Sequence, residues 1–163
     1  MPVSKINNAA AEIEKFYGFD VKILGQYKLP EAAYCSIRKR YIAKIILNYL
    51  ASLEIPGSAG KNYKVIALTN KDIETEDGDT HWGVMGLAFL GGDVSIVSTF
   101  RMNSKRSRLQ KVILHETGHM MNIDHCSSKD QKCFMKDAKG KGATIDQTKK
   151  HLCKDCKLKL IFI

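Results

Sequence analysis

The spacing of apolar side chains predicts strands in the first two thirds of the chain. Residues 19–24 alternate apolar with polar side chains, a pattern typical of a strand with one buried face. Residues 64–69 form a short, mostly apolar run, and residues 94–100 are rich in β-branched side chains, so both are predicted to be strands. Residues 82–90 are predicted to be a further strand, at an edge of the sheet. A polar, acidic stretch, residues 74–79, interrupts the pattern before that strand.

Two long helices are predicted from apolar positions three or four residues apart. The first covers residues 37–53 and is ended by the proline and glycines of residues 56–60. The second begins near Arg108, where residues 107–110 fit a capping box, and ends at Asn122, because asparagine tolerates the left-handed conformation of a helix terminus. Its buried stripe is predicted to be Leu109, Val112, Ile113 and Thr117. Strands linked by helices indicate an α/β layered domain.

The composition fits one ordinary domain, and only the charge stands out. The chain has 163 residues, 44% of them hydrophobic and 26% charged, which is enough for a single domain with its own core. Its net charge is +9, and residues 129–159 hold ten lysines against four aspartates. A solvated, solubilising face is the simpler interpretation. A surface that attracts acidic substrates or nucleic acid is the alternative, which the lack of interleaved arginines and aromatic residues disfavours.

The chain carries no sign of a membrane or export segment. No apolar run approaches the ~20 residues that a transmembrane helix needs. The first eight residues lack the apolar core of a signal peptide. We therefore expect a cytoplasmic protein with no membrane partner, in a reducing compartment that disfavours disulfides.

The second predicted helix carries a metal-ligand motif, His-Glu-x-x-His. His115 and His119 lie one turn apart on one helix face, so both imidazoles can reach one ion. His125 follows six residues later, after a turn that can bring it back to the same ion. Three neutral imidazoles with one open position are typical of a catalytic zinc site. Glu116, beside the first ligand, can take a proton from zinc-activated water and deliver it to a leaving amine, as in a zinc hydrolase.

Four of the five cysteines predict a second metal site. Cys126 and Cys133 follow the third histidine, and Cys153 and Cys156 form a C-x-x-C pair. Four thiolates around one zinc make a closed tetrahedral site, which suits structure rather than hydrolysis. Such a site would pin a C-terminal segment that has few apolar residues. Unconnected reduced thiols and a disulfide pair are the alternatives. Cys35 stands apart beside apolar residues, and we expect it to be a small buried hydrophobe.

Residues 115–156 closely resemble the archaemetzincins, a branch of the metzincin zinc peptidases. The family pattern is H-E-x-x-H-x-x-G-x-x-H-C, then a cysteine followed by x-Met, then seventeen residues and C-x-x-C. The chain matches it through Cys133-Phe134-Met135 and the seventeen residues that separate Met135 from Cys153. It departs from the pattern twice: Asn122 stands at the glycine position, and six residues separate the first two cysteines, more than is usual in the family.

The resemblance implies a compact metzincin fold of the α/β (α+β) class, with a twisted mixed sheet, an active-site helix and a small zinc-bound lower part. Residues 1–163 would form a single metallopeptidase domain. Its upper part would cover residues 1–124 and its lower part residues 125–163, with a cleft between them. Met135 would form the Met-turn beneath the catalytic zinc, and residues 82–90 would bind an extended peptide by strand addition.

Three functions are open at this stage. The leading hypothesis is a monomeric zinc peptidase that holds two zinc ions and acts on a peptide or protein substrate. A second is a nucleic-acid-associated metalloprotein, because the bacterial ribosome-linked metalloproteins share the three-histidine spacing and this chain is basic. Those proteins lack the glutamate and the four cysteines, so Glu116 and Cys153-x-x-Cys156 argue against this hypothesis. A third is a zinc-stabilised binding protein without turnover.

Overall fold

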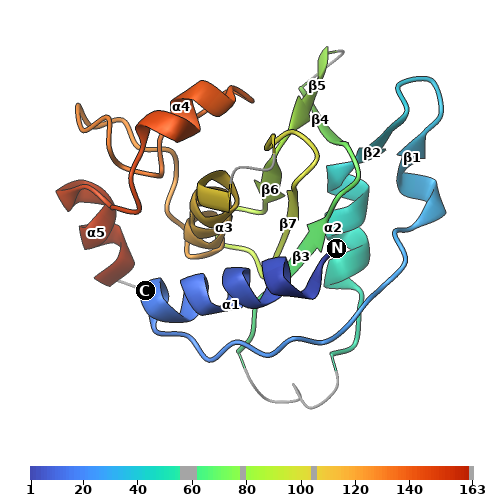
Figure 1. Ribbon diagram of the computed structural model, residues 1–163, viewed down its shortest axis with the longest axis horizontal. Helices are drawn as coiled ribbons and strands as arrows, with labels where there is room; N and C mark the ends of the chain where they lie inside the picture. Colours follow the sequence, from blue (N-terminus) through green and yellow to red (C-terminus); the bar gives the residue numbers. More distant parts are fainter. Residues whose placement is uncertain (56–61, 78–79, 104–105, 162–163) are drawn as a thin grey trace.

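The computed structural model describes residues 1–55, 62–77, 80–103 and 106–161, which form helices packed around two small sheets (Figure 1). The α-helices are α1 (Val3–Tyr17), α2 (Ala43–Ala51), α3 (Arg106–Met120), α4 (Gly142–Gln147) and α5 (Lys154–Ile161). The strands are β1 (Tyr34–Cys35), β2 (Arg40–Ile42), β3 (Val65–Thr69), β4 (Ile73–Asp77), β5 (Thr80–Val84), β6 (Gly86–Ala88) and β7 (Val94–Ser98). A short 3-10 turn, η1 (Glu31–Ala33), precedes β1.

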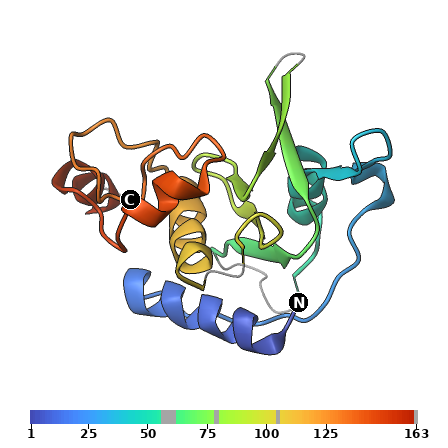
Figure 2. The ribbon, with the colours of Figure 1, turned by 45° about the horizontal axis from the view of Figure 1, so that its top comes forward.

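The two sheets are both of mixed direction. One has the order β3-β7-β6, in which β3 and β7 are parallel and β6 runs antiparallel to β7. The other has the order β1-β2-β4-β5, with only β2 and β4 parallel. β4 and β5 form a hairpin that rises from the body of the molecule (Figures 1 and 2). Only Met85 separates β5 from β6, so the chain passes directly from one sheet to the other.

Helices cover both faces of the β3-β7-β6 sheet. On one face Val97 packs with Ile113 of α3 and with apolar side chains of α1. On the other face Ile96 packs with Leu47 of α2. Every residue of β7 is buried, as expected of a central strand between two helical layers. α3, which carries the metal-ligand motif, therefore rests on a rigid support.

The α/β class is confirmed, and so are the strands predicted at residues 64–69 and 94–100, which are β3 and β7. The expected mixed sheet is present as two sheets. The strand predicted at residues 82–90 is divided between β5 and β6 because the chain changes sheet at Met85. The acidic stretch contains most of β4, which is held by its ladder with β5 rather than by an apolar pattern; residues 78–79 of that stretch lie outside the described part of the chain.

The strand predicted at residues 19–24 is wrong. Residues 18–30 form an extended connection outside both sheets, and Ile23 is 51% exposed. An alternating pattern makes a strand only where a partner strand supplies hydrogen bonds, and none lies beside this segment in the described structure. The helix α1 before it was not predicted.

Both predicted helices are present with different bounds. α2 begins at Ala43 rather than at residue 37, because residues 40–42 are taken up by β2 between β1 and β4. Residues 56–60, predicted to end this helix, lie outside the described residues. α3 already includes Ser107, so the predicted capping box does not cap it. Cys35 is half-buried in β1 rather than fully buried.

α1 ties the N-terminal segment to α3. The two helices lie side by side in Figure 2, and Ala9 and Ile13 of α1 are buried in their shared core. At the end of α1 the hydroxyl of Tyr17 donates a hydrogen bond to the carbonyl oxygen of Leu114, at 2.7 Å. None of the described helices combines the length and the apolar character needed to cross a bilayer.

We expect Tyr17→Phe to lower the free energy of unfolding by about 1 kcal/mol, because it removes one partly buried hydrogen bond and little packing volume. The melting temperature should fall by about 2–4 °C, measured by circular dichroism. Tyr27→Phe is the matched control, since Tyr27 is 52% exposed. Equal shifts in the two variants would contradict the assigned role of the Tyr17 hydroxyl.

Candidate metal centre and active site

α3 presents three residues of the motif toward a groove while its other face is buried. Leu109, Val112, Ile113 and Thr117, the predicted stripe, are all buried. His115 and His119 lie one turn apart and are half-buried, and Glu116 between them is 5% exposed. The helical period therefore separates the packing face from the chemical face, as the sequence predicted.

The turn after α3 brings the chain back toward the helix. Asn122 has φ 55°, in the left-handed region. The N–H of Asn122 donates to the carbonyl of His119, and the N–H of Ile123 donates to that of Gly118, both at 2.9 Å. These are the two bonds of a Schellman motif. Asparagine thus performs the backbone role of the glycine in the family pattern, and His125 follows the turn.

The geometry of the imidazoles calls for a cation. Nδ1 of His115 lies 2.7 Å from the carbonyl oxygen of Phe134, and Nδ1 of His119 lies 2.9 Å from that of Ile123. A carbonyl oxygen only accepts, so each Nδ1 carries the proton and each Nε2 presents a lone pair. The two Nε2 atoms are 2.9 Å apart. Lone pairs this close repel each other unless a positive ion lies between them.

The third imidazole joins this pair. Ligand nitrogens of His115, His119 and His125 all lie within 4.8 Å of one another. Burial, aided by the neighbouring His119, lowers the pKa of His115 to about 3, and burial also lowers the pKa of His119. Neutral imidazoles are the form that binds metal. The donor set fits zinc: three imidazole nitrogens, two of them on rings whose Nδ1–H groups are fixed by backbone carbonyls.

Glu116 lies in a low-dielectric position beside the ligands. Burial raises the pKa of Glu116 to about 8. A divalent cation at the imidazoles acts in the opposite direction, because an adjacent positive charge favours the carboxylate. Gly86 of β6 makes room for this side chain: a Cβ there would lie 2.7 Å from Cγ of Glu116. Gly86 could not be identified from the sequence, because nothing in the chain's pattern links residues thirty positions apart.

Met135 lies beneath the helix that carries the imidazoles. It is fully buried, and its Sδ would lie 2.6 Å from a Cβ added to Gly118. Its carbonyl oxygen accepts a hydrogen bond from the N–H of Cys126 at 2.8 Å. Glycine at position 118 therefore allows the close approach of Met135 to α3, and a glycine inside the motif is the sequence signal for this approach.

The three imidazoles and Glu116 open onto a groove of about 760 Å³. Trp82, Leu87 and Ala88 line one wall, and residues 136–140 line part of the wall contributed by the C-terminal segment. β6 pairs with β7 along one edge, and its other edge has no strand partner among the described residues. The groove can therefore take an extended chain beside β6.

The four cysteines after His125 also come together. Their sulfur atoms lie within 4.8 Å of one another, and Cys126 Sγ is 3.5 Å from Cys153 Sγ. All four are buried free thiols. Burial raises the pKa values of Cys133 and Cys156; at Cys153 the same burial is outweighed by hydrogen bonds, from Ser128 first, that lower its pKa to about 6. Four sulfur donors at one point fit a tetrahedral zinc ion.

Backbone hydrogen bonds connect the cysteine cluster with the imidazoles. The N–H of Phe134, whose carbonyl holds His115, donates to the carbonyl of His151 at 2.9 Å. Lys136 Nζ donates to the carbonyl oxygens of Cys126 and Ser128. The His151 side chain pairs with Asp130 at 2.8 Å and lies outside the sulfur cluster. The segment that orients one metal ligand is thus held by the region that carries the cysteines.

We expect Asn122→Val to destabilise the protein and Asn122→Gly to leave it unchanged. A β-branched residue in the left-handed region costs roughly 1–2 kcal/mol, which corresponds to a fall of about 2–8 °C in melting temperature. Differential scanning calorimetry of the two variants in parallel gives the comparison. A valine variant as stable as the glycine variant would show that the turn does not depend on the left-handed conformation.

Comparisons with known proteins agree with this arrangement. No protein-family model matches the chain. The archaemetzincin of Haloarcula marismortui is 30% identical to it over 154 residues, which cover 83% of each protein. The crystal structure of the archaemetzincin of Methanopyrus kandleri is 25% identical, covers 98% of this chain and 86% of its own, and superposes with a TM-score of 0.81. A structure from Methanocorpusculum labreanum, described as a zinc-dependent peptidase, is 22% identical, covers 98% of this chain and 95% of its own, and has a TM-score of 0.79. The chain belongs to the archaemetzincin family.

Proposed function

We propose that the chain hydrolyses peptide bonds at its three-imidazole centre, with Glu116 as the general base. Membership of the archaemetzincin family makes the chain a zinc metallopeptidase. The observation that carries the mechanism is the pair of Nε2 atoms 2.9 Å apart, in the same groove as the buried carboxylate of Glu116, the residue after His115. A buried carboxylate beside the imidazoles supports turnover over binding alone, because desolvated titratable groups cluster at catalytic sites.

The residues of the chain divide the chemistry among them. Zinc in a site of this kind supplies Lewis acidity to the scissile carbonyl and to the attacking water. The Glu116 carboxylate accepts a proton from that water as its oxygen bonds to the carbonyl carbon, and returns it to the amine nitrogen as the C–N bond breaks. The Nδ1–H bonds of His115 and His119 hold both rings in the orientation that ligation needs.

The substrate is proposed to lie extended along the free edge of β6. Gly86, Leu87 and Ala88 all line the groove, next to Glu116. Strand addition at this edge would provide main-chain hydrogen bonds regardless of sequence, so specificity would come from the side-chain pockets. Of the predicted edge, residues 82–90, all but Gly83 and Phe89 line the groove, which supports this role.

A second zinc ion is proposed at the four cysteines, giving two per chain. Its role would be structural: it would hold the lower part, residues 125–163, against the upper part, residues 1–124, with Met135 as the Met-turn between them. The apolar cluster of the lower part includes the four cysteines themselves, so an ion would replace packing that the segment lacks. The monomeric state and the cytoplasmic location stay predictions.

We expect Glu116→Gln to lower kcat/KM for peptide hydrolysis by at least about a hundredfold, because general-base catalysis contributes that much or more. The amide has the shape of the carboxylate, so zinc content should not change. Glu76→Gln is the control, since Glu76 lines the same groove. The measurement is cleavage of a fluorogenic peptide library together with metal analysis. A Glu116→Gln variant as fast as the parent enzyme would refute the assigned base.

We expect Cys156→Ser to lose one zinc per chain and to lower the melting temperature by more than about 10 °C, the effect of losing several kcal/mol of metal-linked stability. Peptidase activity should fall as well, because Phe134 and Cys126 connect the two sites. Cys35→Ser is the control, since Cys35 lies in β1 outside the sulfur cluster. Unchanged metal content and melting temperature in Cys156→Ser would exclude a structural zinc at the cysteines.

A further inference from the structure

A second pocket, of about 550 Å³, lies where the carboxyl ends of β3 and β7 meet. β3 and β7 are parallel, so the loops that follow them, residues 70–72 and 99–101, lie at the same end of the sheet. The turn between β1 and β2 closes the pocket from the other side. The crevice outside the carboxyl ends of parallel strands is where open α/β sheets bind ligands. Within the described structure this pocket and the catalytic groove share no lining residue.

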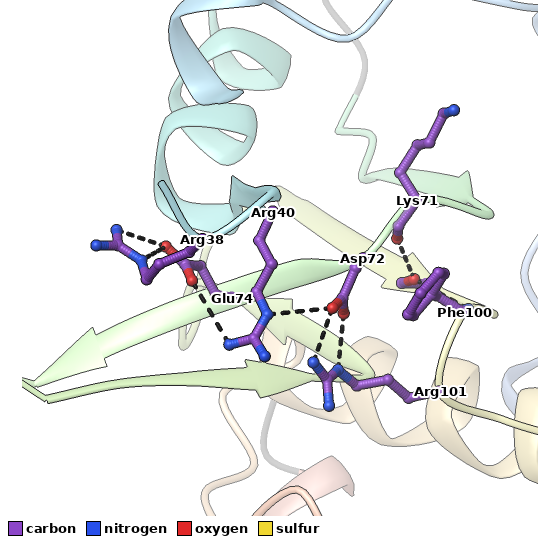
Figure 3. Close-up of polar contacts among 8 residues, drawn as sticks. Arg38, Arg40, Lys71, Asp72, Glu74, Phe100 and Arg101 are labelled. Atoms are coloured by element: carbon purple, nitrogen blue, oxygen red, sulfur yellow. Dashed lines mark hydrogen bonds and ion pairs between the residues drawn. The ribbon is translucent and has the colours of Figure 1, made fainter. Parts of the chain in front are cut away.

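Two carboxylates hold three guanidinium groups in fixed positions beside this pocket (Figure 3). Asp72 accepts from Arg101 Nε at 2.7 Å and Nη2 at 2.8 Å, and from Arg40 Nε at 3.1 Å. Glu74, whose side chain is fully buried, accepts from Arg38 Nε at 2.7 Å and lies 3.8 Å from Arg40. The guanidinium groups exceed the carboxylates by one, so the cluster keeps a positive charge.

The guanidinium groups also keep donors that face outward. The side chains of Arg38 and Arg40, which line the pocket, are 31% and 30% exposed. Each guanidinium has five N–H groups, and the carboxylates behind them use only some. Lys39 and Lys71 line the same pocket and have no ion pair with any residue that the structure describes. The pocket therefore presents cations that are already oriented, which suits an anion.

Aromatic rings lie among these cations. Tyr34 is 47% exposed and Phe100 is 60% exposed, and both line the pocket. Tyr41 also lines the pocket, and its ring centroid lies 5.0 Å from that of Tyr34. Exposed rings beside cations are the combination that binds nucleotides, because a base stacks on the ring while a cation contacts the phosphate. An acidic peptide would use the cations and leave the rings exposed to water.

We propose that this pocket binds a nucleotide unit, either a free mononucleotide or one residue of a single-stranded nucleic acid. The base stacks on Phe100 or Tyr34. The phosphate contacts Lys71, which lies on the Phe100 side of Asp72, and the outward N–H groups of Arg38 and Arg40 attract it from the other side (Figure 3). The net charge of +9 favours the encounter with a polyanion. This function is separate from peptide hydrolysis and does not depend on it.

The test is equilibrium binding to the zinc-loaded full-length protein. A short fluorescein-labelled oligouridylate is titrated and followed by fluorescence anisotropy, with AMP, inorganic phosphate and oligoglutamate as competitors. Phe100→Ala should weaken binding by about tenfold or more, since stacking contributes ~1–3 kcal/mol per base. Lys71→Ala should weaken binding and reduce the slope of log Kd against log salt by about one. Both variants should retain peptidase activity.

Matched control variants distinguish binding in this pocket from nonspecific electrostatic binding to the basic surface. Tyr27→Ala removes an exposed ring elsewhere, and Lys159→Ala removes a charge from the basic C-terminal segment; both should leave Kd unchanged. Displacement by AMP supports a free nucleotide as ligand, and binding of the oligonucleotide without displacement by AMP supports a single strand. Absence of saturable binding, equal effects of Phe100→Ala and Tyr27→Ala, or displacement by oligoglutamate as strong as that by AMP would overturn the proposal.

Discussion

The Nε2 atoms of His115 and His119 lie 2.9 Å apart, and each carries a lone pair. Much of this structure serves to hold the two rings in that orientation. The helix supplies the spacing, but ring orientation requires a carbonyl oxygen behind each Nδ1. For His119 that carbonyl belongs to Ile123, so it exists only because the chain turns back at Asn122. For His115 it belongs to Phe134, nineteen residues along the chain. The ligand set is thus assembled by tertiary contacts and not by the helix alone.

The dependence continues into the cysteine region. Phe134 lies between Cys133 and Met135, and its N–H donates a hydrogen bond to the carbonyl oxygen of His151, two residues before Cys153. Few apolar side chains other than these support the segment, and its core is the sulfur cluster with Phe134, Met135 and a few neighbours. A metal ion there would stabilise both the lower wall of the groove and one imidazole of the other site. In the proposed arrangement the adjacent residues His125 and Cys126 would serve two different metal sites.

The sequence predicted features that depend on a short segment of the chain. It did not predict features that depend on a contact with a distant element. The spacing of His115 and His119, and the ability of Asn122 to take positive φ, are properties of short segments, and both were predicted. Gly86 and Gly118 were missed, because each is small to accommodate a side chain from another element, Glu116 in one case and Met135 in the other. The strand predicted at residues 19–24 failed for the same reason, since a strand depends on a neighbour that its own pattern does not contain.

The β4–β5 hairpin lines the groove of the imidazoles, and Asp72, which lines the second pocket, directly precedes it. Toward the catalytic groove it presents Thr75 and Trp82, which pair across the ladder. At its base Arg101 packs against Gly83, where a Cβ would collide with the guanidinium, and that guanidinium is paired with Asp72. Glu74, fully buried and opposite Gly83 in the ladder, needs Arg38 and Arg40 as partners, because an unpaired buried carboxylate costs several kcal/mol. The position of one wall of the groove at the imidazoles is therefore set by the same ion pairs that arrange the cations of the second pocket.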